Sequence, residues 1–237
     1  MSAIFRGGSG WSGSAYYQAG PGVALGDNLG FWTAWLGVFP SGAPTATRQF
    51  ASALGGVGGW DMRITGAMSA LTWRMYDTTP NGVTYTSSIL AAADLDRLQM
   101  YVALWDGPAQ KQRAFWKRAE VGTGTSRAGY QPSPTETLRI GGVPAEPTTA
   151  GDLVQTYGFA YGLGVLTLAE VQALYDAVMA NERMMGVPGK TDHLFDFTAD
   201  SLSGALPPTF TDKQGSAVLT KNGAPVYSER FARSWGW

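Results

Sequence analysis

The amino-acid sequence predicts an all-β protein with one short capped helix at about residues 168–183. Charged residues make up only 15% of the chain, against roughly 25% in typical globular proteins, and there are 32 glycines, a composition that suits a turn-rich β protein. Apolar residues recur in short alternating or continuous runs between Gly, Pro and Asn turns. A single segment combines helical apolar spacing with a capping signal.

The first half of the chain contains a central-strand candidate and a hairpin. Residues Phe31–Phe39 are almost continuously apolar, which is typical of a strand covered on both faces. Residues Leu71–Tyr76 alternate apolar and polar side chains, and Val83–Thr86 alternate again. Between them, Asn81-Gly82 supplies the positive-φ positions of a tight turn. We therefore expect an antiparallel hairpin here.

The second half contains an aromatic strand followed by the helix. Tyr157, Phe159 and Tyr161 alternate with small residues, which leaves the other face of this strand open to a closely packed neighbour. Thr167 and Glu170 form a capping box, in which each side chain accepts a hydrogen bond from the other's backbone N–H. An apolar stripe at helical spacing is then expected to lie on the strands: Leu168, Val171, Leu174, Tyr175, Val178 and Met179. The helix is expected to end between residues 183 and 186.

With 237 residues the chain can bury a sizeable core in one domain. We expect this domain to span residues 1–186. Residues 187–237 are too few for a second core, so we expect a C-terminal extension docked on the main domain or on a neighbouring subunit. Within it, Ala217–Lys221 and Ala224–Ser228 flank Asn222-Gly223 and predict another hairpin.

Four motifs in a fixed order carry a family resemblance over roughly residues 5–185. They are the strand and turn Tyr101–Gly107, the short aromatic strand Phe115-Trp116, the strand Thr137–Gly142 with its L-x-I-G pattern, and the capped helix start Thr167–Val171. Together they resemble the laminin-G-like branch of the concanavalin A-like β-sandwiches. The resemblance implies two antiparallel sheets in a jelly roll. It also implies binding of glycans or proteins, as in adhesins, pentraxin-like proteins and phage virion proteins.

The residues needed for hydrolysis are missing from their usual patterns. Glucanases on this scaffold place two carboxylates on one strand, yet no Glu here has an Asp two positions later. A serine hydrolase needs a base, and His193 is the only histidine, while no Gly-x-Ser-x-Gly elbow occurs. We expect no catalytic residues, and we interpret His193 as a structural or surface residue.

Nine tryptophans can fill a core or stack on sugar rings. Those in strand patterns are expected in the core: Trp32, Trp35, Trp73 and Trp105. Trp60, Asp61 and Tyr130 lie in Gly-rich, loop-like surroundings and are the candidate glycan-binding residues.

Aromatic residues also occur near both ends of the chain, among Gly and Ser. Trp11 and Tyr16 are near the start, and Trp235 and Trp237 are at the end. Exposed rings of this kind are unfavourable on a free monomer, so we expect them to make subunit contacts, with a homo-oligomer as one outcome.

Calcium is frequent in the family that the chain resembles, held by carboxylates and carbonyls. Asp94 and Asp96 would share a face if their segment were extended, and they are the weak calcium candidates. No Asp-x-Asp-x-Asp-Gly loop occurs, and the chain has no cysteine. We therefore expect no metal and no other cofactor.

The formal net charge of −1, without a dense Lys/Arg run, predicts no nucleic-acid partner and no membrane partner. The N-terminus has no basic region followed by an apolar one, so we expect no signal peptide. A virion protein reaches the outside by lysis and needs none, so we place the protein on a virion or another extracellular surface.

These observations favour a non-enzymatic binding or structural module on the surface of an assembled particle. We expect a phage decoration, fibre or tail-associated protein that contacts other virion proteins and cell-surface polysaccharide. The alternative is a free carbohydrate-binding, lectin-like protein. A divergent glycoside hydrolase is the third hypothesis.

Overall fold

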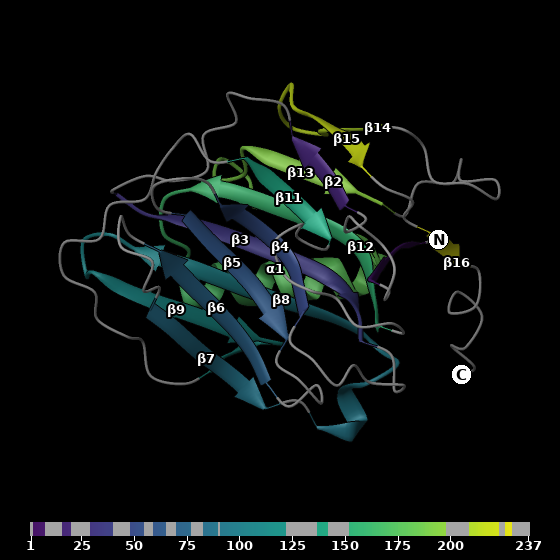
Figure 1. Cartoon of the computed structure of the whole chain (residues 1–237). Helices are drawn as coiled ribbons and strands as arrows, with labels where there is room; N and C mark the ends of the chain where they lie inside the picture. Colours follow the sequence, from purple (N-terminus) through teal and green to yellow (C-terminus); the bar gives the residue numbers. More distant parts are fainter. Residues whose placement is uncertain are drawn as a thin grey trace.

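A computed structural model of the chain consists of two stacked antiparallel sheets with one helix against the outer face of one of them (Figure 1). It describes residues 2–7, 16–19, 29–39, 48–54, 59–64, 70–76, 83–89, 91–121, 137–141, 152–197, 209–222 and 226–228. The all-β fold class with one helix is confirmed. None of the described helices is long and apolar enough to cross a lipid bilayer.

The first sheet has the strand order β10-β9-β8-β3-β12-β1-β16, and β13 also pairs with β12. β1 and β13 lie end to end along the same side of β12, because they pair with different halves of it. The strands are β1 (Ser2–Gly7), β3 (Phe31–Val38), β8 (Leu98–Asp106), β9 (Lys111–Trp116), β10 (Ala119–Glu120), β12 (Asp152–Leu163), β13 (His193–Asp196) and β16 (Val226–Ser228).

The second sheet has the strand order β14-β15-β2-β11-β4-β5-β6-β7. Its last three strands pair in sequence order, and the pairing of Met75 with Val83 confirms the predicted hairpin between β6 and β7. The strands are β2 (Tyr16–Ala19), β4 (Arg48–Leu54), β5 (Gly59–Ile64), β6 (Ala70–Tyr76), β7 (Val83–Ile89), β11 (Leu138–Gly141), β14 (Thr209–Thr211) and β15 (Val218–Asn222).

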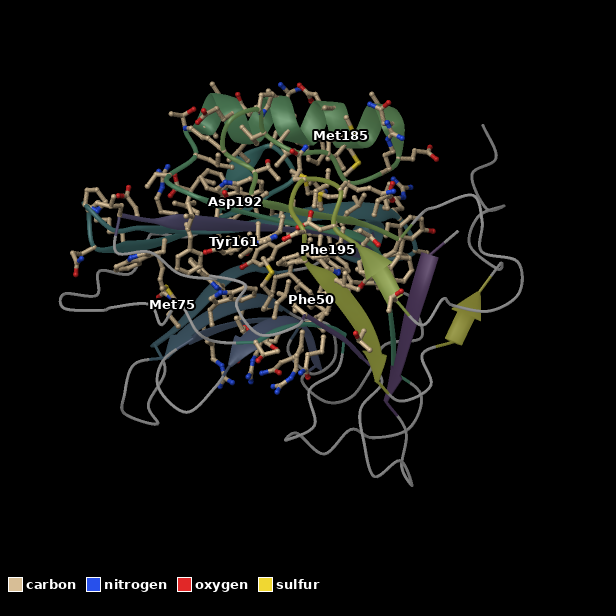
Figure 2. All side chains as sticks on the ribbon, turned by 90° about the horizontal axis from the view of Figure 1, so that it is seen from above. Phe50, Met75, Tyr161, Met185, Asp192 and Phe195 are labelled. Atoms are coloured by element: carbon tan, nitrogen blue, oxygen red, sulfur yellow. The ribbon has the colours of Figure 1, made fainter. Side chains whose placement is uncertain are left out.

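Two separate apolar clusters hold three layers together. The larger one lies between the sheets, where Figure 2 shows Phe50 and Phe195. The smaller one lies between the first sheet and the helix α1 (Leu168–Asn181), with Met185 packed at its edge. β3 is buried along its whole length because these two clusters cover its two faces, as its continuous apolar sequence predicts. The four tryptophans assigned to the core are all 0% exposed.

The helix begins as predicted. The Thr167 hydroxyl accepts from the Glu170 N–H at 3.2 Å, and the Glu170 carboxylate accepts from the Thr167 N–H at 2.8 Å. The helix ends at Asn181, two residues earlier than predicted, because Glu182 adopts the left-handed conformation at φ 50°. Leu168 was expected in the buried stripe but is 43% exposed.

The small residues of β12 allow the segment after α1 to pack against the sheet. A Cβ on Gly162 would stand 1.8 Å from the Lys190 carbonyl oxygen, and one on Gly158 would stand 2.3 Å from the Met184 Cβ. The Trp32 indole donates to the same Lys190 carbonyl at 2.9 Å. The expected close neighbour of this strand is therefore the 184–190 segment, which fixes α1 on the first sheet.

The chain after Gly186 contributes four strands to the two sheets. β13 and β16 join the first sheet, and β14 and β15 join the second. The predicted hairpin over residues 217–228 is wrong. Its first arm, β15, pairs with β14 and β2, whereas its second arm, β16, pairs with β1 in the other sheet. Asn222-Gly223 is a local turn signal, but the strand with which each arm pairs is decided by contacts with distant parts of the chain.

Candidate functional site

The outer face of the second sheet carries a polar cluster centred on β5. Strand alternation places Trp60, Met62 and Ile64 in the core, so Asp61 and Arg63 point to the opposite side of the sheet. α1 packs on the first sheet and does not cover this face (Figure 2). A polar alternation on a strand that faces away from the core is where a ligand-binding surface can be built.

Asp61 is the hub of this cluster. Its carboxylate is 0% exposed and accepts from Arg63 Nε at 2.7 Å, from Arg63 Nη2 at 2.6 Å and from Gln49 Nε2 at 2.8 Å. On the other side, Arg74 Nη2 donates to the same carboxylate at 3.0 Å. The two-pronged contact from Arg63 holds the guanidinium plane in place. Removing one partner of such a buried pair costs about 3–5 kcal/mol, so the geometry is strongly maintained.

One polar side chain from each of seven neighbouring strands lies on this face in cross-strand register. We call this set the polar row; in sheet order it is Thr209, Thr220, Gln18, Arg139, Ser52, Asp61 and Arg74. Directly opposed side chains on one face lie close enough to interact. Accordingly, Arg139 Nε donates to Gln18 Oε1 at 3.3 Å. The row is buried at Ser52 and Asp61 and becomes exposed toward Thr209 and Thr220.

Three buried polar atoms near Asp61 lack a hydrogen-bond partner among the described residues. They are Ser52 Oγ, Thr72 Oγ1 and Gln49 Oε1. Thr72 faces Arg63 across the strands, so all three atoms belong to the same outer face. Each unsatisfied buried polar atom costs about 1–3 kcal/mol. Ordered water at these buried atoms would supply the missing partners.

The described part of this face is electropositive. Three guanidinium groups, Arg63, Arg74 and Arg139, lie near one carboxylate, Asp61. The side chain of Arg74 is 24% exposed, and Arg139 is also partly exposed. The face therefore presents two reachable planar donor groups, the kind that recognise carboxylates and hydroxyl pairs.

The structure corrects the expected glycan platform. Trp60 lies in β5 rather than in a loop, its side chain is 1% exposed, and its ring stacks on Phe159 at 6.2 Å between centroids. It is a core residue that a sugar does not reach. Asp61 does lie on the candidate face, but beneath the arginines. Tyr130 lies outside the described residues.

Most of the predicted subunit-contact residues also lie outside the described residues, namely Trp11, Trp235 and Trp237. The backbone of Tyr16 is in β2, paired with Asn222 and Gly141. The expected subunit contacts therefore stay predictions.

The calcium candidates do not have the expected geometry. Asp94 ends a short 3-10 helix (Ala92–Asp94), and Asp96 has a left-handed backbone at φ 58°, so the segment is not extended. Burial raises the pKa of Asp94, but Lys117 Nζ at 2.6 Å and the Ala91 N–H outweigh it and hold the pKa below its usual range. Among the described residues no group of three or more His, Cys, Asp or Glu side chains is placed to hold a metal ion.

His193 contacts Asp212, a residue of the turn after β14. Its Nδ1 lies 2.6 Å from Asp212 Oδ2, and its ring stacks on Phe195. Burial opposes ionisation of Asp212, but the backbone N–H groups of Leu194, Gln214 and Gly215, together with His193, lower its pKa. This contact ties the turn after β14 to β13.

A hollow in the described surface lies at the end of α1. It has a volume of about 530 Å³ and lies between the 183–189 segment, β13 and the turn at Lys213 and Gln214. No aromatic ring lines it, and none of its described residues has a buried polar atom without a partner. It therefore offers fewer groups for recognition than the polar row.

Sequence reasoning missed most of the polar cluster. Gln49, Arg63 and Arg74 are separated by up to 25 positions, and only the pairing of β4 with β5 and of β5 with β6 brings them together. The available signal was the alternation in β6, where Thr72 and Arg74 interrupt apolar residues. It indicates which side chains face outward, but it does not indicate which other strands share that face.

Comparison of the sequence finds no matching family model and no matching curated protein. Comparison of the structure finds similar folds. A proposed carbohydrate-binding protein from Bacteroides ovatus has a TM-score of 0.61 at 13% identity, over 95% of this chain and 62% of that chain. A native heptameric SAP-like pentraxin from Limulus polyphemus has a TM-score of 0.58 at 12% identity, over 92% and 94%.

A third neighbour is the CBM40 of the Ruminococcus gnavus IT-sialidase, bound to α2,3-sialyllactose. It has a TM-score of 0.50 at 13% identity, over 64% of this chain and 84% of that chain. The structural similarity establishes the fold, a jelly-roll β-sandwich of the lectin-like type. At such low sequence identities it does not establish the function, which has to be argued from the residues of the site.

Proposed function

We propose that the protein is a non-catalytic carbohydrate-binding module that holds its ligand on the outer face of the second sheet. The observation that carries this proposal is the cluster around Asp61, where guanidinium, amide and hydroxyl groups of three strands converge and the side chain of Arg74 is 24% exposed. A sugar offers many hydroxyl groups at short spacing and matches such a surface. The neighbours named for carbohydrate binding support it by analogy.

The same cluster argues against glycoside hydrolysis on this face. That reaction uses two carboxyl groups, one as acid and one as nucleophile or base. Asp61 is the one carboxylate among the described residues of the cluster, and two arginines and Gln49 occupy its oxygens. The Asp61 carboxylate therefore holds the two arginines in place. We infer binding without turnover.

The test is a glycan array probed with the monomeric protein, followed by titration calorimetry on the sugars that bind. Arg74→Ala and Arg139→Ala should each weaken binding by about tenfold or more, the loss expected for one charge-assisted contact. Arg113→Ala is the matched control. Arg113 is also 24% exposed and also forms an ion pair, with Glu120, but it lies on β9 of the first sheet.

The outcomes separate two roles of the cluster. If the Arg74 and Arg139 variants bind every glycan as well as the Arg113 variant does, the face does not hold the ligand. If they only lower the unfolding temperature, the network is structural. Arg139→Ala is the second variant, because the Arg139 side chain donates to Gln18 on β2, whereas Arg74 donates to Asp61 itself.

A role on the surface of an assembled, phage-like particle stays a prediction. A module displayed on such a particle could bind its ligand with the second sheet while the first sheet faces the particle. The native mass in solution and the identity of neighbouring genes test it: capsid or tail genes beside this gene favour the particle, and a secretion operon contradicts it.

A further inference from the structure

The hollow at the end of α1 has the size and the kind of lining that small-molecule sites have. Its volume of about 530 Å³ falls within the range of ligand pockets, roughly 300–1,000 Å³, which are mostly apolar with a few polar groups. The buried residues of its lining are all apolar, namely Met184, Val187 and Leu194. Met185 is half-buried and lies between α1 and the loop that joins β14 to β15 (Figure 2).

Hydrogen bonds hold both walls of this hollow in place. On one wall, the Thr191 hydroxyl accepts from the Val187 N–H at 2.6 Å and donates to the Val187 carbonyl at 3.0 Å. On the other wall, the Lys213 N–H donates to the Leu194 carbonyl at 2.7 Å. Asp212 Oδ1 accepts from the Leu194 N–H at 2.8 Å. Because the walls are already ordered, a ligand loses little affinity to rearrangement of the protein.

The charge of the described lining is not balanced. It contains two basic side chains, Arg183 and Lys213, and one acidic side chain, Asp196. Both basic residues are exposed, and neither side chain forms an ion pair or a hydrogen bond with another residue of the described part of the chain. The neighbouring Lys190 differs, because its ammonium group lies 2.7 Å from the Glu170 carboxylate. Two cations at the opening of an apolar hollow favour an anionic ligand.

The apolar lining also selects what the rest of the ligand is. A sugar would bring many hydroxyl groups against Val187 and Leu194, where they would lose water without gaining hydrogen bonds. An aliphatic or aromatic body avoids this cost, and the unbranched, polarizable side chain of Met185 adapts to either shape. The hollow therefore differs from the glycan face in the class of ligand that it suits.

We propose that this hollow binds a small amphipathic carboxylate. The apolar body of the acid lies against Met185 and the buried apolar side chains, and its carboxylate pairs with Arg183 and Lys213 at the opening. A guanidinium binds a carboxylate through two parallel hydrogen bonds, and an ammonium adds a second charge. This site is independent of the proposed glycan site, which lies on the outer face of the second sheet.

The test compares ligands that share a body and differ in the head group. The probes are octanoate, octanamide and octylamine, and indole-3-acetate, indole-3-acetamide and tryptamine, with acetate as the carboxylate that has almost no body. Calorimetry on the full chain measures their affinities. In at least one of the two series we expect the acid to bind about tenfold or more tightly than its amide, and the amine to bind weakest. Acetate should bind at least tenfold more weakly than that acid.

Methionine methyl groups report where the ligand binds. The chain has eight methionines, and the NMR spectrum of protein labelled with carbon-13 at these methyl groups resolves them by substitution. The Met185 signal should shift during the titration with the acid, whereas the signal of Met75 on β6 of the second sheet should not. The Met185→Gln variant both assigns the signal and removes apolar contact, so it should weaken the acid and its amide alike.

Variants at the opening test the head-group contact. Arg183→Gln and Lys213→Gln should each weaken the acid by about tenfold and leave the amide unchanged. Arg97→Gln is the matched control, because Arg97 is also exposed, also has no described side-chain partner and lies outside the hollow. Since none of these side chains makes a described contact, all three variants should keep the wild-type melting temperature.

Four results overturn this inference. They are no binding of either acid, equal affinity for acid and amide in both series, an unshifted Met185 signal at saturation, and acid binding that neither Arg183→Gln nor Lys213→Gln weakens more than Arg97→Gln does. Each of these leaves the glycan proposal standing, because that proposal is decided by the Arg74 and Arg139 variants on the second sheet. Loss of glycan binding in those variants with intact acid binding separates the two sites.

Discussion

Replacing Trp60 with alanine tests the placement of this residue in the core. The side chain is 1% exposed, stacks on Phe159 at an interplanar angle of 12°, and lies opposite Met75 on β6. Truncating a buried tryptophan costs about 3–5 kcal/mol, through lost transfer free energy and the cavity left behind. A domain has only about 5–15 kcal/mol of stability, so the variant should lose about a fifth of it or more.

The assay is urea unfolding followed by far-ultraviolet circular dichroism. We expect a large fall in the transition midpoint with an unchanged slope, which reports lost stability rather than a changed unfolded state. Leu168→Ala is the control, because Leu168 is 43% exposed on α1 and its truncation should cost less than about 1 kcal/mol. A Trp60→Ala protein with the wild-type midpoint but without glycan binding would refute the assignment to the core.

Three further substitutions test contacts that position α1 and the C-terminal strands. Gly162→Ala should lower the free energy of unfolding by about 2 kcal/mol or more, because the new Cβ would clash with the Lys190 carbonyl oxygen. Gly189→Ala is the control: its Cβ would meet open space, so it should cost only about 1 kcal/mol, from the positive φ of Gly189. Urea unfolding compares the two variants. Thr167→Val should cost about 1 kcal/mol by removing the helix cap, measured by thermal unfolding, and an unchanged melting temperature would contradict it. Asp212 has a lowered pKa in the fold, so its stabilisation is present above the unfolded pKa of about 3.9 and is lost as pH falls through the lower, folded value. Asp212→Asn should therefore be less stable at pH 7 and lose less stability between pH 5 and pH 2 in urea titrations; an unchanged acid slope would count against this role.

Elements that depend on neighbours in sequence are predictable. The cap of α1 needs only Thr167 and Glu170, three positions apart. The hairpin of β6 and β7 needs one turn and two alternating segments. The continuous apolar sequence of β3 predicts that both of its faces are covered. In each case the physical cause lies within a few residues, so the sequence pattern contains it.

Elements that depend on distant partners are not predictable in the same way. The glycines before Trp60 indicate a loop, but this segment forms β5, which pairs with β4 on one side and with β6 on the other. Every second residue of β5 therefore points into the core. Asp94 and Asp96 were calcium candidates on the expectation of an extended segment. Asp94 instead lies in a short 3-10 helix, and its carboxylate forms an ion pair with Lys117. The free energy of strand pairing comes from contacts with strands that are distant in the sequence, so the local composition does not predict it.

By itself, the sequence determined that this chain is an all-β protein with one capped helix, because alternation, turn residues and capping act over a few positions. Only the tertiary structure decided which outward side chains share a face. Arg139, Ser52, Asp61 and Arg74 form a row because β11, β4, β5 and β6 pair in one register. A shift of one residue in any pairing would send its side chains into the core, so the candidate site exists only once the sheet has formed.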